Sequence, residues 1–147
     1  MTVSYPTMIK DIKDKLLSTI KSTTTFADKA TADYVNLQDE SRNPIATLRL
    51  RSDTFRALAS KETSHTINFE IWIHYVGGYQ ESTLNSLIEY VGEIIDAIEA
   101  DRTLGSSYVI NTEVKTVDFS MTPLASGRSP VRHTARILVE VLAIRNL

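Results

Sequence analysis

The sequence has 147 residues, of which 42% are hydrophobic and 23% charged, and these values are typical of one globular domain. The absence of cysteine excludes a disulfide framework and thiolate chemistry. No apolar run reaches the length of a membrane-spanning helix, and the N-terminus lacks the apolar core of a signal peptide. We therefore expect no membrane partner, and synthesis in the cytosol.

The net charge of −2 is unevenly distributed along the chain. Residues 62–101 carry eight acidic residues and no Lys or Arg, whereas the segments on either side are each net basic. This distribution disfavours a simple nucleic-acid binder, which usually has a net basic surface. Two interpretations remain: complementary faces that meet in an oligomer, or acidic helix faces that are merely solvated.

The first half of the chain predicts one helix followed by strands. Residues 6–21 have the 3–4 spacing of an amphipathic helix, and its apolar positions are Met8, Ile9, Ile12, Leu16 and Ile20. A short strand is expected around Tyr34–Leu37, and a second strand at 45–51. Residues 52–64 are polar, and we expect a hairpin tip or a short helical turn there.

The centre contains the clearest strand and the clearest helix. In 65–76 the apolar residues alternate with polar ones, and Asn68, Glu70, Trp72 and His74 share the second face. The following helix has an apolar stripe that we expect to lie on the sheet: Leu84, Leu87, Ile88, Val91, Ile94, Ile95 and Ile98. It should end near Gly105, which can adopt a positive φ.

Two extended segments complete the chain. Residues 107–121 predict a strand with a bulge near Lys115, 122–130 a loop, and 131–147 a final strand. The predicted class is therefore α+β: a mostly antiparallel mixed sheet packed against helices, in the order α-β-β-α-β-β, with a long C-terminal β-hairpin. An additional early strand is possible in this scheme, and residues 1–147 form a single domain.

The last strand is unusually long for a compact domain, since strands normally have about 3–10 residues. Either it bends or frays, or the hairpin 107–147 protrudes and reaches a neighbouring molecule. Residues 137–144 are apolar on both faces, so that Leu138, Leu142 and Ile144 need a cover besides the core. The first helix or another subunit could provide that cover. Trp72 lies on an otherwise polar face, either under a loop or as an interface anchor.

Catalytic, cofactor and metal motifs are weak in this sequence. His65, His74 and His133 lack the spacing of a zinc site, and there is neither a nucleophile elbow nor a phosphate-binding loop. We expect no enzyme, cofactor or metal. A base formed by His74 and Glu70 is the catalytic alternative. A stripe of arginines is the nucleic-acid alternative, without aromatic platforms to support it: Arg49, Arg51, Arg128, Arg132 and Arg136.

Three segments carry a resemblance to a known family. They are the strand end His74-Tyr75-Val76-Gly77-Gly78, the turn Asp101-Arg102-Thr103-Leu104-Gly105, and the hydrophobic strand Ala135–Arg145. Together with the N-terminal helix, they resemble the tail terminators, the minor tail or tail-completion proteins of long-tailed phages. The likeness covers nearly the whole chain by element order. Related families often follow the turn with a second glycine, where this chain has Ser106.

The resemblance implies a structural virion protein that forms a hexameric ring at the head-proximal end of the tail. Its partners would be further copies of itself, the tail-tube protein and the head connector or head-completion protein, with DNA only passing through the lumen. A ring requires a heterologous interface between unlike patches. We expect the hairpin 107–147 to meet the acidic central segment of the next subunit, and the predicted subunit or partner contacts are Trp72, His74, Arg128, Arg132, Arg136, Leu138, Leu142 and Ile144.

Two other functions remain open at this point. Another phage neck protein, such as a head–tail joining factor or an adaptor on the connector, is the first alternative. The second is a small ligand-binding or catalytic α+β domain, which a deep pocket lined by His74, Glu70 and another titratable group would favour.

Overall fold

The computed structural model describes residues 3–32, 44–58, 61–78, 81–125 and 128–146, with the backbone alone described for 124, 125 and 128–130. Within these described residues, two helices and five strands follow in the order α1, β1, β2, β3, α2, β4 and β5. The predicted α+β class is confirmed, and the additional strand precedes the two expected ones. The strand expected near Tyr34–Leu37 falls outside the described residues.

Helix α1 (Tyr5–Lys21) begins where the sequence predicts it. Ser4 caps its N-terminus by accepting a hydrogen bond from the backbone N–H of Thr7 at 3.4 Å, and Pro6 lies in the first turn, where its missing N–H costs nothing. All five predicted apolar positions are buried. The helix ends at Lys21 with Ser22 as its C-cap, next to the polar, β-branched Thr23–Thr25.

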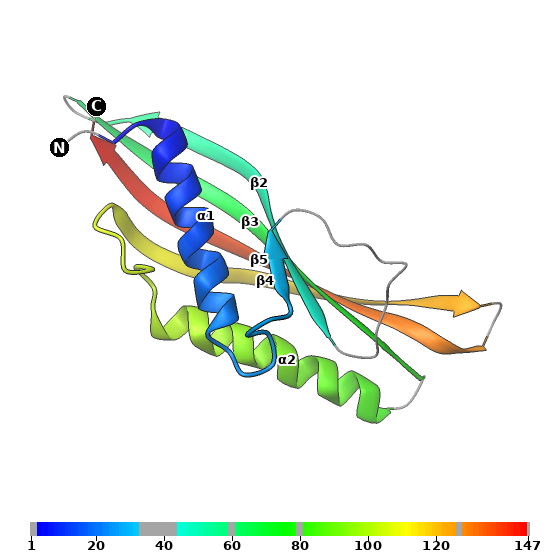
Figure 1. The fold of residues 1–147 in the computed structure, drawn as a ribbon. Coiled ribbons are helices and arrows are strands. Elements are labelled where there is room, and N and C mark those ends of the chain that lie inside the picture. Colours follow the sequence, from blue (N-terminus) through cyan, green and yellow to red (C-terminus); the bar gives the residue numbers. More distant parts are fainter. Residues whose placement is uncertain (1–2, 33–43, 59–60, 79–80, 126–127, 147) are drawn as a thin grey trace.

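The five strands form one mixed sheet in the spatial order β1-β2-β3-β5-β4 (Figure 1). Its members are β1 (Ala30–Ala32), β2 (Ile45–Ala57), β3 (Glu62–Gly77), β4 (Val109–Ala125) and β5 (Arg128–Asn146). Only β1 and β2 are parallel, and the other pairs are antiparallel. In this order β3 and β5 are interior strands along their length, and β2 is interior only where β1 pairs with Ala46–Leu48.

Strands extend into two segments that were expected to be a hairpin tip or helical turn (52–64) and a loop (122–130); the antiparallel pairing of β2 and β3 agrees with the hairpin alternative for the first. β2 continues to Ala57 and β3 starts at Glu62, so that most of 52–64 is paired, for example Phe55 with His65. β4 likewise continues to Ala125, and β5 starts at Arg128. Polar residues suit the ends of β2 and β4 because most of their side chains there are exposed. Pro123 is tolerated because β4 is an edge strand. The predicted bulge is confirmed by a register shift between Val114 and Thr116.

The length of β5 is accommodated within the domain. β3 pairs with it without interruption from Glu62 opposite Asn146 to Gly77 opposite Val131. Neither a bend nor a protrusion of the whole hairpin is needed, because β3 is almost equally long. Only residues 128–130 of β5 extend past the last residue of β3, and there the tip of the β4–β5 hairpin projects beyond α2 (Figure 1).

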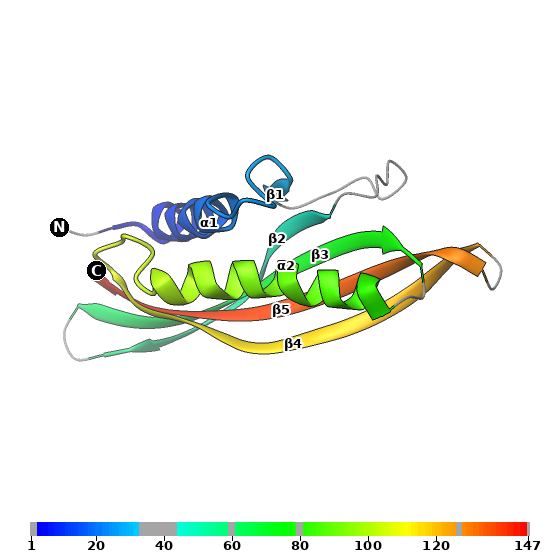
Figure 2. The ribbon, with the colours of Figure 1, turned by 90° about the horizontal axis from the view of Figure 1, so that it is seen from below.

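Helix α2 (Glu81–Ala100) lies with α1 on one face of the sheet (Figure 2). Ile71 and Ile73 of β3 and Ile137 and Val139 of β5 point toward the helices and are fully buried. The turn after α2 places Leu104 (φ 54°) in the core and gives Gly105 a φ of 66°, which confirms the predicted ending.

The apolar stripe of α2 is only partly buried, contrary to the sequence-based prediction. Leu87, Val91, Ile94 and Ile98 face the sheet, whereas Leu84 and Ile88 are 41% and 49% exposed. The stripe is wider than the line along which a helix contacts a sheet, so its outer members remain in solvent. An apolar surface is thus left on the N-terminal half of α2.

Candidate interaction surface

The face of the sheet opposite the helices, which we call the open face, carries most of the predicted contact residues. Side chains alternate along a strand, and residues opposite each other in the register point to the same side. Trp72 lies opposite Arg136 and Glu70 opposite Leu138, while their neighbours Ile71 and Ile73 enter the helix-covered core. Within the described residues no helix covers this open face (Figure 2).

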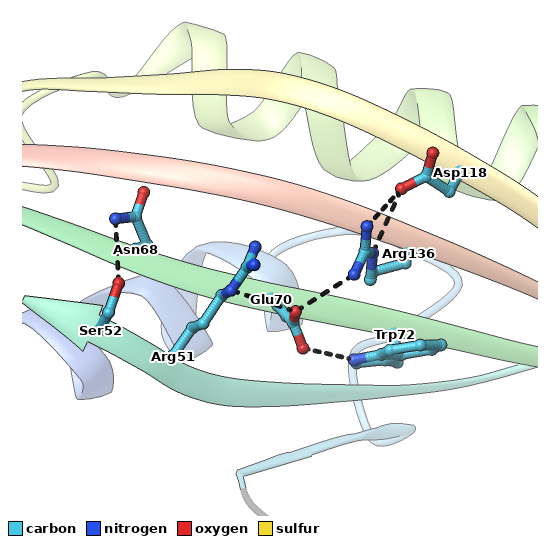
Figure 3. A network of polar contacts seen from close by, with 7 residues as sticks. All are labelled: Arg51, Ser52, Asn68, Glu70, Trp72, Asp118 and Arg136. Carbon is cyan, nitrogen blue, oxygen red and sulfur yellow. Dashed lines mark hydrogen bonds and ion pairs between the residues drawn. The ribbon is translucent and has the colours of Figure 1, made fainter.

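A network of polar side chains spans the middle of the open face (Figure 3). The Arg136 guanidinium donates to Asp118 Oδ2 at 2.6 Å through Nη2, and it lies 3.5 Å from Glu70 Oε1. Glu70 also accepts a hydrogen bond from Trp72 Nε1 at 3.1 Å, and Arg51 lies 3.8 Å away. The neighbouring carboxylates raise the pKa of Arg136, with the hydrogen bond to Asp118 as the largest cause. Four strands, β2, β3, β5 and β4, are thereby linked across one face.

Trp72 is held between aromatic and cationic neighbours. Its ring is stacked nearly parallel to that of His74, with 6.3 Å between the centroids, and the Arg136 guanidinium carbon lies 6.0 Å from the Trp72 centroid. The side chain is half-buried. A preorganised, partly exposed tryptophan beside an arginine has the composition of an interface anchor.

The apolar residues of β5 divide between the two faces. Ile137, Val139, Val141 and Ala143 are fully buried beneath the helices. Leu138 and Leu142 lie on the open face and are half-buried, so neighbouring side chains cover them only in part. Ile144 is also half-buried and lines a cavity of about 580 Å³ at the start of α1, together with Ser4 and Tyr108.

The predicted basic residues of the hairpin occupy different surroundings. Arg136 contacts Glu70, which belongs to the acidic central segment, but it does so within one chain. Arg132 is half-buried near the end of β3, opposite Val76. The side chain of Arg128 lies outside the described residues. Contact between the basic hairpin and the acidic segment of another subunit remains a prediction.

None of the cavities described for this chain lies at the position that the catalytic alternative requires. Glu70 is hydrogen-bonded to Trp72 and paired with Arg136. Cavities of about 580, 450 and 400 Å³ are present, and neither Glu70 nor His74 lines any of these three. Among the described residues, no group of three or more His, Asp or Glu is placed to hold a metal ion, and no helix is long and apolar enough to cross a membrane.

A buried polar cluster near the start of α1 was missed by the sequence interpretation. His65 Nδ1 and Asp53 Oδ2 are 2.8 Å apart, and Arg145 Nε donates to His65 Nε2 at 3.3 Å. Tyr5 and Phe55 pack their rings against His65. Burial, followed by the charge of Asp53, raises the pKa of Tyr5. The alternation of residues in 65–76 did indicate that His65 is buried, because His65 falls on the same side of the strand as Ile67 and Phe69.

A second missed feature is a groove beside the edge strand β4. Phe119 and Met121 lie on the helix-covered face of β4, and together with Leu84 and Leu87 of α2 they line a cavity of about 450 Å³. The sequence did indicate apolar residues on this helix, because Leu84 and Leu87 belong to its predicted apolar stripe. Their relation to β4 depends on the packing angle of α2, which the sequence does not reveal.

Comparison with known proteins does not identify a family for this chain. No protein-family model matches the sequence, and a search of curated proteins also finds no match. The described residues themselves establish an α+β domain in which α1 and α2 cover one face of the sheet.

Proposed function

We propose that this chain is a non-catalytic structural subunit of a phage virion. It forms a ring, hexameric by the resemblance described above, at the head-proximal end of the tail. There it ends polymerisation of the tail tube and joins the tail to the head connector. Assembly takes place in the host cytoplasm, and DNA contacts the ring only while passing through its lumen.

The observation that carries this proposal is the open face of the sheet. The half-buried Leu138 and Leu142 lie on it, on either side of Glu140 along β5, and Trp72 is the diagonal neighbour of Leu138 within the charged network of Arg136, Glu70 and Asp118. An apolar centre bordered by polar groups is the usual composition of a protein interface. A sheet with helices on one side only can present such a surface without reorganising its core.

The arrangement also supports a structural function over a catalytic one. The charged groups of the open face satisfy one another, for instance Arg136 with both Glu70 and Asp118. A general base requires an accessible group beside a bound substrate. Glu70 instead accepts a hydrogen bond from Trp72 and lies beside Arg136, an arrangement that orients an interface anchor.

The direct test is to locate the chain in assembled particles. Antibody labelling followed by electron microscopy should place it at the junction of head and tail, and light scattering of the purified chain should give six times the chain mass of 16.5 kDa. Label at the distal tip of the tail, or no label on any particle, would contradict the proposal. Label on heads that lack tails would favour the head–tail joining or connector-adaptor alternative.

A further inference from the structure

Within the described residues, the sheet has two long edges that are free over much of their length. At one margin β4 pairs only with β5, and at the other β1 pairs with β2 only at Ala46–Leu48. β2 and β4 lie at opposite sides of the sheet (Figure 1). The outer side of such a strand presents a row of N–H and C=O groups that can pair with a strand of another molecule.

Each of these edges contains one regular segment, and the two segments are of similar length. The pairing of β2 with β3 is uninterrupted over 52–57, which we call the β2 edge. The pairing of β4 with β5 is uninterrupted over 116–123, which we call the β4 edge, although register shifts lie on either side of it. Bulges commonly protect a sheet edge from pairing with other chains. The β2 edge and the β4 edge both lack this protection.

The strand directions allow one edge to pair with the other edge of a second copy. Successive strands in the order β2-β3-β5-β4 are antiparallel, so that β2 and β4 run in opposite directions. A second copy added in the same orientation therefore brings its β2 edge antiparallel to the β4 edge of the first copy, with the helices of both on the same side. Contact between unlike edges of successive copies is the heterologous arrangement from which rings are built.

A single register makes the two edges complementary on both faces of the sheet. On the helix-covered face, the β2 edge presents Phe55, which is 62% exposed, and the β4 edge presents Phe119, which is 47% exposed. On the open face, Arg56 and Asp118 are exposed, and the side chain of Asp118 remains 59% exposed in its ion pair with Arg136. Because residue numbers rise along one antiparallel strand as they fall along the other, pairing Phe55 with Phe119 also places Arg56 opposite Asp118. Aromatic pairs and opposite charges across neighbouring strands stabilise a sheet.

The same register also matches the hydroxyl side chains of the open face. It places Thr54 opposite Ser120 and Ser52 opposite Thr122, and all four of these residues are exposed. Hydroxyl pairs across neighbouring strands contribute to sheet stability. Beyond them, β4 ends close to where the part of β2 that pairs with β1 begins. Backbone pairing alone would accept any strand, but matched side chains on both faces select a second copy of this chain.

We infer that the β2 edge of one copy pairs with the β4 edge of the next, with Phe55 opposite Phe119, so that the sheet continues from copy to copy. This inference rests on the proposed function only in assuming that copies of the chain assemble. It assigns the lateral contact to the strand edges and leaves the middle of the open face, around Trp72, for the tail tube or the connector. Asp118→Asn keeps a side-chain oxygen that accepts a hydrogen bond from Arg56, and the contact tolerates this substitution.

The test is disulfide cross-linking between copies, which is specific because the chain contains no cysteine of its own. The register places Thr54 of one copy opposite Ser120 of the next. Cα atoms of opposite residues are about 4.5–5.5 Å apart, which suits a disulfide. Under mild oxidation, the full chain with Thr54→Cys and Ser120→Cys should form a ladder of covalent oligomers up to the complete ring on a non-reducing gel. A reducing agent should return the ladder to the single chain.

Thr54→Cys combined with Thr116→Cys is the matched control, because Thr116 is exposed on the same face of β4 but lies about 13 Å along the strand from Ser120. Neither this variant nor the two single-cysteine variants should form the ladder, and circular dichroism establishes that all variants are folded. Equal ladders from both double variants would show that the register is wrong. If the first variant forms no ladder although the unaltered chain sediments as an oligomer, the contact is wrong while assembly stands. An unaltered chain that remains monomeric at millimolar concentration overturns both the contact and the proposed ring.

Discussion

His65 and Asp53 are joined by a 2.8 Å hydrogen bond between neighbouring strands, with the His65 ring fully buried and the Asp53 side chain 4% exposed. Because Arg145 Nε donates to His65 Nε2, that nitrogen is the acceptor, and Nδ1 carries the proton donated to Asp53. The two hydrogen bonds of His65 together fix one tautomer and tie β2, β3 and β5 together close to α1.

Loss of Asp53 should therefore destabilise the domain. Asp53→Ala leaves the His65 N–H buried without an acceptor, and the free energy of unfolding should fall by about 1–3 kcal/mol. Asp14→Ala, on the exposed side of α1, is the control and should change it by less than about 0.5 kcal/mol. Urea titrations of both variants measure the difference. If both substitutions changed the free energy of unfolding equally, the hydrogen bond between His65 and Asp53 would not stabilise the domain.

Two glycines should respond in opposite directions to the same substitution. An added Cβ on Gly92, inside α2, meets no atom within 4 Å, so that Gly92→Ala should stabilise the protein by about 0.5–1 kcal/mol. A Cβ on Gly77 would lie 2.6 Å from Thr83 Cγ2, and Gly77→Ala should destabilise it. Adding Thr83→Ser removes that methyl group and should restore part of the loss. Thermal melts would refute the assignment if both alanines acted alike.

Tyr108 should make stability depend on pH in the alkaline range. Burial, together with the hydrogen bond that its hydroxyl donates to Asp11, raises the pKa of Tyr108 from its ordinary value of 10.0 to about 12. Because the unfolded chain loses this proton first, the stabilisation is complete below pH 10 and is lost as the pH rises toward 12. The stability difference between the unaltered chain and Tyr108→Phe should fall over that range. A difference that is constant from pH 9 to 12 would contradict the assignment.

The open face offers a paired test of the proposed assembly. Arg136→Gln and Asp118→Asn both remove the same ion pair, but only the first removes a cation from the surface. We expect Arg136→Gln to weaken assembly several-fold in light scattering, and the effect to diminish at high salt because charge interactions are screened. Asp118→Asn should assemble normally. If both variants assemble like the unaltered chain at every salt concentration, Arg136 is not a contact residue.

Much of the fold follows from local periodicity. The 3–4 spacing of Met8 to Ile20 predicted α1, and the alternation of Ile67 to Ile73 predicted β3, because each pattern fits only one regular backbone geometry. The same alternation placed Trp72 and Glu70 together on the face away from the core. The positive φ of Gly105 was likewise predictable from the turn that follows the helix.

The tertiary structure decided what depends on contact between distant segments. Leu84 and Ile88 share the stripe of Leu87 and Val91, yet the position of α2 on the sheet left the first two exposed. His65 meets Asp53 twelve residues away and Arg145 eighty residues away only because the strand register aligns them. Periodicity specifies which side of an element is apolar, but the sheet to which it packs determines how much of that side is covered.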